Sequence, residues 1–309
     1  AYYGVKRNQN QRPLDYFYLP YRHAILHSDS KMPQRGSTMR YILTISLFMT
    51  IALCSSPALA ADKDQPRTYT DPVTKMQFVL IPGGSFTMGD PTGKDPFAKP
   101  AHEVSVESFY LGKFEVTWQE YEQFARDSLT ELPDDEDWGR GIRPVINVTW
   151  DEAVAFTRWL SKKTRKKFRL PTEAEWEFAA RGGTTTPYYW GENFGRSNAN
   201  CAKCGSPWDG KQTAPIGSFP ANPFGLHDMT GNVYEWCLDT RHRSYEGAPT
   251  DGSAWTKGGQ KDSRGREFRM NRGGSWFQPA REMTVYRRCW DAAEDRRSEL
   301  GFRVLLEIP

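Results

Sequence analysis

The chain has 309 residues and a formal net charge of +3, with lysine and arginine interspersed among aspartate and glutamate. This near balance excludes the strongly basic surface typical of nucleic-acid binding. The content of 26 glycines, 21 prolines and 11 tryptophans predicts many loops and short elements packed around aromatic side chains. A basic run from Arg158 to Lys167 is expected on the solvated face of a helix.

The first 60 residues are expected to stand apart from the folded domain. Residues 1–38 show no clear periodicity, and we interpret them as a disordered, non-native or mis-annotated extension. Residues 39–60 combine a basic start, an apolar run and a small-residue end, as a secretory signal peptide does, so cleavage is expected after Ala60. The apolar run is too short to span a bilayer comfortably. We therefore expect a periplasmic protein without a membrane span, beginning with a polar lead-in over residues 61–75.

Short strands are predicted after the lead-in. Residues 76–82 form an apolar run that ends at a proline, and residues 85–89 alternate after a Gly-Gly turn. Residues 102–116 also largely alternate, which predicts two strands broken near Gly112.

Three helices are predicted by capping boxes. In a capping box, a threonine side chain accepts a hydrogen bond from the backbone amide of a glutamate three residues later, and the glutamate side chain accepts one from the threonine amide. The three pairs are Thr117 with Glu120, Thr149 with Glu152, and Thr172 with Glu175. The first helix is expected to run from Trp118 to about Asp127, and the third to end at Gly182. After Gly182 the chain is expected to be mostly loop.

Four cysteines remain after the predicted cleavage site: Cys201, Cys204, Cys237 and Cys289. An even number in an oxidising compartment indicates disulfides. Of the three possible pairings, we favour Cys201–Cys204 together with Cys237–Cys289. A zinc site is disfavoured because the single C-x-x-C has no second pair or nearby histidine pair. A thioredoxin-like redox motif is disfavoured because it would be expected near a βαβ pattern, whereas this C-x-x-C lies in a segment rich in glycine, proline and asparagine.

Five segments, in the same order, resemble the motifs of the formylglycine-generating-enzyme (sulfatase-modifying-factor) family. They are Ile81–Gly89, Arg169–Glu177, Gly225–Trp236, Arg272–Ser275 and Gly301–Arg303. The resemblance covers residues 76–306. It implies one α+β domain over residues 76–309, related to C-type lectins, with few helices, short strands and much irregular loop.

The resemblance also implies two structural calcium sites. The first would be formed by Asn200, Cys201, Asp209 and Lys211, and the second by Asp228, Gly231, Val233 and Glu235. The asparagine and the acidic residues would contribute side-chain oxygens and the others backbone carbonyls, which are ligands that calcium prefers. Asp228 and Glu235 could instead be ordinary surface or capping carboxylates.

The chain departs from the family at the two cysteines that bind copper in its oxidases. The matching positions are Gln278 and Met283. Copper(I) prefers thiolates, so neither copper nor formylglycine generation is expected. His102, His227 and His242 are well separated, which argues against the iron-dependent relatives with this fold. The sequence leaves the redox cofactor unidentified.

Two exported branches of the family that lack these cysteines suggest a function. One is the PvdO-like branch of periplasmic pyoverdine maturation, and the other comprises accessory proteins of denitrification clusters. The overall similarity favours the first. We therefore expect a monomeric oxidoreductase-type protein that helps to oxidise the peptide-linked, dihydropyoverdine-type chromophore alongside other periplasmic maturation enzymes. The alternative is a non-catalytic binding module.

The resemblance places the candidate site between Tyr234 and the segment that begins at Ser275. Glu282 is the candidate acid/base, with Ser275 orienting the substrate. The expected substrate contacts are Tyr234, Trp276, Gln278, Arg281 and Arg287. The aromatic rings would stack on an aromatic substrate, and the arginines would bind anionic groups. The structural alternatives are a turn cap at Ser275, a core position for Trp276, and ion pairs of Arg287 or Arg288 with Asp291 or Glu294.

Overall fold

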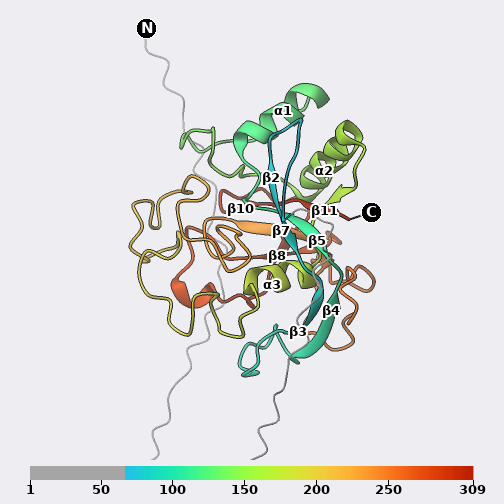
Figure 1. Ribbon diagram of the computed structural model, residues 1–309, viewed down its shortest axis with the longest axis vertical. Helices are drawn as coiled ribbons and strands as arrows, with labels where there is room; N and C mark the ends of the chain where they lie inside the picture. Colours follow the sequence, from blue (N-terminus) through green and yellow to red (C-terminus); the bar gives the residue numbers. More distant parts are fainter. Residues whose placement is uncertain (1–66, 309) are drawn as a thin grey trace, which may run out of the picture. The chain divides into compact units, whose positions relative to one another are not determined.

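The computed structural model describes residues 67–308, so the predicted extension and signal peptide lie outside the described residues. Within this range the chain forms three α-helices, three small sheets and long loops (Figure 1). Helices α1 and α2 lie towards one end of the domain, and the β3-β4 hairpin lies towards the other (Figure 1). This α+β architecture confirms the predicted fold class.

The largest sheet has the strand order β1-β2-β5-β11-β6, with antiparallel neighbours throughout. Its strands are β1 (Thr68–Thr70), β2 (Gln77–Ile81), β5 (Phe109–Gly112), β6 (Phe168–Arg169) and β11 (Leu305–Glu307). Strand β11 pairs with both β5 and β6, so the end of the chain is part of the core. Strand β1 lies within the lead-in, where no strand was predicted.

The second sheet, of order β10-β7-β8-β9, positions the candidate site. Its strands are β7 (Tyr234–Thr240), β8 (Phe268–Arg272), β9 (Cys289–Ala292) and β10 (Leu300–Gly301). Strands β3 (Gly84–Met88) and β4 (His102–Val106) form a separate antiparallel hairpin. The predicted strands at β2 and β3 are confirmed. The chain between Gly182 and β7 is irregular, as expected, but β7 to β11 were not predicted.

The predicted break near Gly112 is wrong. The chain turns at Glu107 and Ser108, whereas Gly112 is the last residue of β5. The Gly83 amide donates to Ser108 Oγ at 2.9 Å, and a side chain at Gly83 would collide with this turn. The close contact with Gly83 therefore fixes the turn. Gly112 stays in the sheet because its amide donates to Val304 O at 2.8 Å.

All three predicted helices form, each with its capping box complete. They are α1 (Trp118–Ser128), α2 (Trp150–Thr164) and α3 (Glu173–Arg181). Helix α3 ends at Gly182, whose φ of 59° is left-handed as a glycine cap allows. The basic side chains between Arg158 and Lys167 are exposed, as expected for a solvated helix face.

Helix α3 is buried over its whole length although it carries charged residues. Glu173 accepts hydrogen bonds from Arg288 Nε at 2.7 Å and from Arg272 Nη1 at 3.0 Å. Glu177 pairs with Arg272 and with Arg181, the latter at 2.7 Å. Buried charges are tolerated when they are paired in this way, so these ion pairs connect α3 to β8 and to the segment before β9.

The predicted Cys237–Cys289 disulfide is wrong. Strand β8 lies between the two cysteines, and its Asn271 is opposite both Trp236 and Cys289. Because side chains alternate along a strand, Cys237 points to the other face of the sheet, where Met270 belongs to the same buried cluster. Both thiols are free. The predicted disulfide between Cys201 and Cys204 is present, with the Cα atoms 5.4 Å apart.

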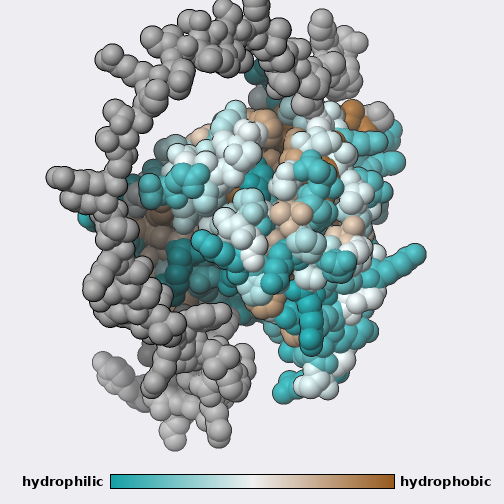
Figure 2. All heavy atoms as spheres, turned by 90° about the horizontal axis from the view of Figure 1, so that it is seen from below, coloured by the Kyte–Doolittle hydropathy of each residue, from teal (hydrophilic) through white to brown (hydrophobic). Residues whose placement is uncertain are grey.

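The described residues contain no helix that is both long and apolar enough to cross a membrane. The part of the surface that is visible in colour in Figure 2 is mainly hydrophilic, with scattered hydrophobic spots.

Removing one partner of the buried ion-pair network should destabilise the domain strongly. Arg288→Ala would leave Glu173 short of its closest donors, and breaking a buried pair typically lowers the free energy of unfolding by about 3–5 kcal/mol. Lys163→Ala is the matched control, because Lys163 pairs with Asp127 where both side chains are more than 40% exposed. We expect this control to lose less than about 1 kcal/mol in urea unfolding. Equal losses in the two variants would refute a structural role for the network.

Candidate functional site

The candidate site is the segment between β8 and β9. It begins with Gly273 and Gly274, whose φ angles of 98° and 77° favour glycine, and it contains a short 3₁₀ turn over Ala280–Glu282. Gly274 lies directly against Met283, and a side chain at Gly274 would collide with the Met283 sulfur. The two glycines therefore let the segment turn sharply and fold back on itself.

The two positions that carry cysteines in the copper oxidases have packing roles in this chain. Met283 is buried in a cluster with Tyr188 and the Cys201–Cys204 disulfide. Gln278 is half-buried, and its carbonyl accepts the Ala202 amide at 2.8 Å. The free thiols Cys237 and Cys289 lie on opposite faces of the sheet and offer no substitute pair. These residues therefore do not fit a copper site.

Charged side chains gather around Arg287. Its Nη1 lies 3.0 Å from Asp95 Oδ2 and its Nη2 lies 2.9 Å from Glu282 Oε2. Arg281 is exposed, with its Nε 3.5 Å from Glu282 Oε1. The side chains of Arg287 and Glu282 are 31% and 26% exposed, so a ligand could reach both. No pattern in the sequence pointed to Asp95, which lies in a loop far from Arg287 along the chain.

The suggested ion pairs of Arg287 or Arg288 with Asp291 or Glu294 are wrong. Arg287 binds Asp95 and Glu282, and Arg288 binds Glu173 in the core. Asp291 instead pairs with Arg297 at 2.7 Å.

Most of the aromatic surface expected at the site is buried. Tyr234 and Trp276 are each only 8% exposed. Trp276 Nε1 donates to Ser298 O at 3.1 Å, and its ring packs edge-on against Trp138 with the centroids 5.1 Å apart. This core role leaves little of the Trp276 ring for a substrate. The exposed aromatic residue of this segment is Phe277, which is 58% exposed, and its ring centroid lies 5.4 Å from that of Trp276.

Ser275 is fully buried and serves the turn. Its Oγ accepts the Phe277 amide at 3.4 Å, and its carbonyl accepts the Gln278 amide at 3.2 Å. These contacts match the structural alternative for Ser275, the turn cap.

Cys289 joins the site beside Tyr234, although sequence reasoning had assigned it to a disulfide. Its Sγ lies 3.4 Å from Tyr234 Oη and donates to it. Burial is the main cause that raises the pKa of both groups, so both stay protonated near neutral pH. Arg287 opposes this increase in the thiol pKa, whereas Glu282 adds to it. The structure therefore brings Tyr234, Glu282, Arg287 and Cys289 together.

The loop predicted as the second calcium site contains a buried excess of carboxylates. Glu115, Asp228 and Glu235 face one buried guanidinium, Arg303, which binds Glu235 at 2.7 and 2.8 Å. Burial raises the pKa of Asp228 to about 6, and burial with the neighbouring carboxylates raises that of Glu115 well above its usual value. Asp228 Oδ1 is buried without a hydrogen-bond partner among the described residues. This excess of negative charge fits a bound cation.

The first predicted calcium loop uses its side-chain oxygens internally. Asn200 Oδ1 accepts from Ser206 Oγ at 2.7 Å, and the Asp209 carboxylate accepts the amides of Lys203 and Gly205. Within residues 67–308, no three His, Cys, Asp or Glu side chains have a metal-binding arrangement. A cation in either loop would therefore depend on backbone carbonyls, as the predicted ligand sets do.

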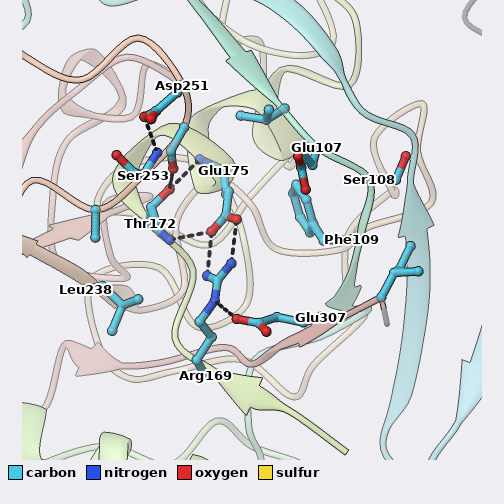
Figure 3. Close-up of a pocket in the computed structure, with 14 residues that line it drawn as sticks. Glu107, Ser108, Phe109, Arg169, Thr172, Glu175, Leu238, Asp251, Ser253 and Glu307 are labelled. Carbon is cyan, nitrogen blue, oxygen red and sulfur yellow. Dashed lines mark hydrogen bonds and ion pairs between the residues drawn. The ribbon is translucent and has the colours of Figure 1, made fainter.

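A separate hollow of about 440 Å³ lies between the β4-β5 turn and the start of α3 (Figure 3). Arg169 binds Glu175 through two hydrogen bonds of 2.7 Å and Glu307 through one of 2.8 Å. Glu175 also completes the capping box of α3. These polar groups hold the strands and the helix together. None of the lining residues belongs to the segment between β8 and β9.

Comparisons with known proteins agree with this architecture. The model of the sulfatase-modifying factor enzyme 1-like domain matches residues 64–308. The formylglycine-generating enzyme of Mus musculus is 30% identical, over 75% of this chain and 75% of that protein. The serine/threonine-protein kinase pkn1 of Chlamydia caviae is 36% identical over 53% of this chain, which spans only 28% of that protein.

The structure of PvdO from Pseudomonas aeruginosa aligns with a TM-score of 0.69 and 32% identity, over 79% of this chain and 99% of that chain. The family match, the order of the motifs and the shared fold lead to one conclusion: the chain belongs to the sulfatase-modifying factor enzyme 1-like family.

Proposed function

We propose that this protein acts in the periplasmic maturation of a pyoverdine-type siderophore, taking part in the oxidation of its dihydro chromophore. The observation that carries the proposal is the ordered cluster of Glu282, Arg287 and Tyr234, retained where the copper ligands are replaced. The similarity to PvdO, which spans 99% of that chain, and the sequence pattern of an export signal support it.

In this proposal, Glu282 handles protons. Oxidation of a dihydro chromophore removes two electrons and two protons, so a base near the substrate assists the reaction. The Arg287 guanidinium lies 2.9 Å from the Glu282 carboxylate and orients it. Arg281 is exposed and would contact anionic groups of the peptide. The step balances when a two-electron acceptor supplied with the substrate, such as dissolved oxygen, takes up the electrons, and we assign only binding and proton transfer to these residues.

A non-catalytic binding module is the second candidate. Both oxygens of Glu282 lie within ion-pair distance of an arginine, as they would in a structural contact. The protein would then present the maturing peptide to a partner enzyme. Because one fold can host unrelated functions, the variants below have to distinguish the two candidates.

We also propose that the loop of Asp228 binds calcium through Asp228, Glu235 and the carbonyls of Gly231 and Val233. The support is the buried, unpartnered Asp228 Oδ1 within an excess of carboxylates. When bound, calcium would neutralise this charge and stabilise the loop that leads into β7.

Deleting the gene should make the producing strain accumulate the dihydro precursor, measured by mass spectrometry of the secreted siderophore. If Glu282 acts in proton transfer, Glu282→Gln should lower the rate of precursor conversion by the purified protein by roughly 10²-fold or more. Glu294→Gln is the matched control, since the Glu294 side chain is 60% exposed, and it should retain full activity. A deletion strain that secretes only mature siderophore would refute the function. Full activity of Glu282→Gln alongside a deletion defect would favour the binding module.

Removing calcium should destabilise the protein. At a free concentration of 100 times Kd, a bound ion contributes about 2.7 kcal/mol, so EGTA should lower the melting temperature by roughly 5–10 °C. Asp228→Asn should abolish this response, whereas the exposed-site control Asp151→Asn should keep it. The calcium proposal fails if wild-type protein purified with calcium melts at the same temperature with and without EGTA.

A further inference from the structure

Two shielded polar atoms near Cys289 have no hydrogen-bond partner among residues 67–308. They are Oδ1 of Asn271 and Nε of Arg287. Asn271 is fully buried and directly opposite Cys289 in the pairing of β8 with β9, and its Nδ2 donates to Asp291 Oδ2 at 2.9 Å. Buried polar groups in native proteins are almost always hydrogen-bonded. Asn271 and Arg287 both flank Cys289, so an unpartnered acceptor and an unpartnered donor are available there for a polar ligand.

The contact between Cys289 and Tyr234 adds a second donor. The thiol donates to Tyr234 Oη across 3.4 Å. Because the hydroxyl oxygen accepts this bond, the hydroxyl proton is left to donate to another group. The thiol thus limits the directions in which the hydroxyl can point.

Arg287 is restrained in a similar way. Its Nη1 and Nη2 bind Asp95 and Glu282, at 3.0 and 2.9 Å, which leaves the Nε–H for another acceptor. The guanidinium is planar, so these two bonds also fix the direction of the Nε–H.

We propose that Tyr234, Arg287 and Asn271 form a subsite for a phenolic hydroxyl of the substrate, and that Cys289 is the residue that positions Tyr234. The subsite offers two donors, Tyr234 O–H and Arg287 Nε–H, and one acceptor, Asn271 Oδ1. A hydroxyl accepts and donates at one oxygen, whereas an ionised carboxylate cannot donate and an ammonium cannot accept. This inference adds detail to the proposed function and rests on it. The proposed chromophore substrate is the reason for choosing a phenol rather than an aliphatic alcohol.

Binding of 4-methylcatechol to the full protein, measured by calorimetry, tests the subsite. 3,4-Dimethoxytoluene is the matched probe, because it has the same ring without hydroxyl protons, and we expect it to bind about tenfold more weakly. Tyr234→Phe and Cys289→Ala should each weaken catechol binding about fivefold, and Cys289→Ser should restore most of it. The Tyr234→Phe/Cys289→Ala double variant should be no weaker than Tyr234→Phe alone, because the thiol acts through the hydroxyl.

Alkylation of the wild-type protein gives a test that does not depend on variants folding. Cys289 is partly exposed, whereas the other free thiol of the described residues, Cys237, is fully buried and serves as an internal control. We expect 4-methylcatechol to slow iodoacetamide labelling of Cys289, followed by mass spectrometry, and 3,4-dimethoxytoluene to leave the rate unchanged.

Three results would overturn the inference: equal binding of the two probes, no protection of Cys289, or unchanged catechol affinity in a folded Cys289→Ala variant. The first two would mean that the polar atoms are satisfied by water alone. The proposed function is tested separately. If the catechol binds as expected but the deletion strain still matures its siderophore, the subsite is supported and the function is refuted.

Discussion

The pairing of Glu173 and Glu177 on α3 with Arg272 and Arg288 is the interaction on which the candidate site depends. Arg272 ends β8 immediately before the candidate segment, and Arg288 ends the segment immediately before Cys289. Both arginines are fully buried and bind Glu173. The two ends of the segment are therefore fixed to one helix, and that helix is itself fixed by its capping box and its left-handed glycine cap.

These ion pairs at the two ends of the segment explain how the fold is kept although the family's copper ligands are absent. Gln278 and Met283 lie between the two fixed ends, where the chain needs only to pack. Met283 fills a buried cluster and Gln278 contributes a backbone bond, so neither thiolate is needed for folding. A side chain between the two fixed ends can change its chemistry at little cost to stability, because the buried charges that would be expensive to unpair, Arg272 and Arg288, lie at the ends themselves.

The features that the sequence predicted well are local, and those that it missed depend on tertiary contacts. A capping box lies within four residues, so the three helices could be predicted from the sequence. The direction of Cys237 depends on the pairing of β7 with β8, which no nearby residue determines, so the disulfide prediction failed. The link between Asp95 and Arg287 spans 192 residues. Once a strand is assumed over these residues, alternation alone places Tyr234 and Trp236 on one face and Cys237 on the other.

The two carboxylates on Arg287 are not equivalent, and this difference bears on how Glu282 could act. Asp95 is the more buried, with 10% of its side chain exposed against 26% for Glu282. The Asp95 amide donates to Asp90 at 2.8 Å, and Asp95 Oδ1 accepts the Phe97 amide at 2.9 Å, so its loop is fixed. Glu282 lies on a single 3₁₀ turn and can rotate away at the cost of its two part-exposed ion pairs, with Arg281 and Arg287, and such pairs each contribute little. Arg287 would then still be held by its bond to Asp95 while Glu282 turns to a substrate. A substrate-facing Glu282 and a preorganised Arg287 are therefore compatible in one structure.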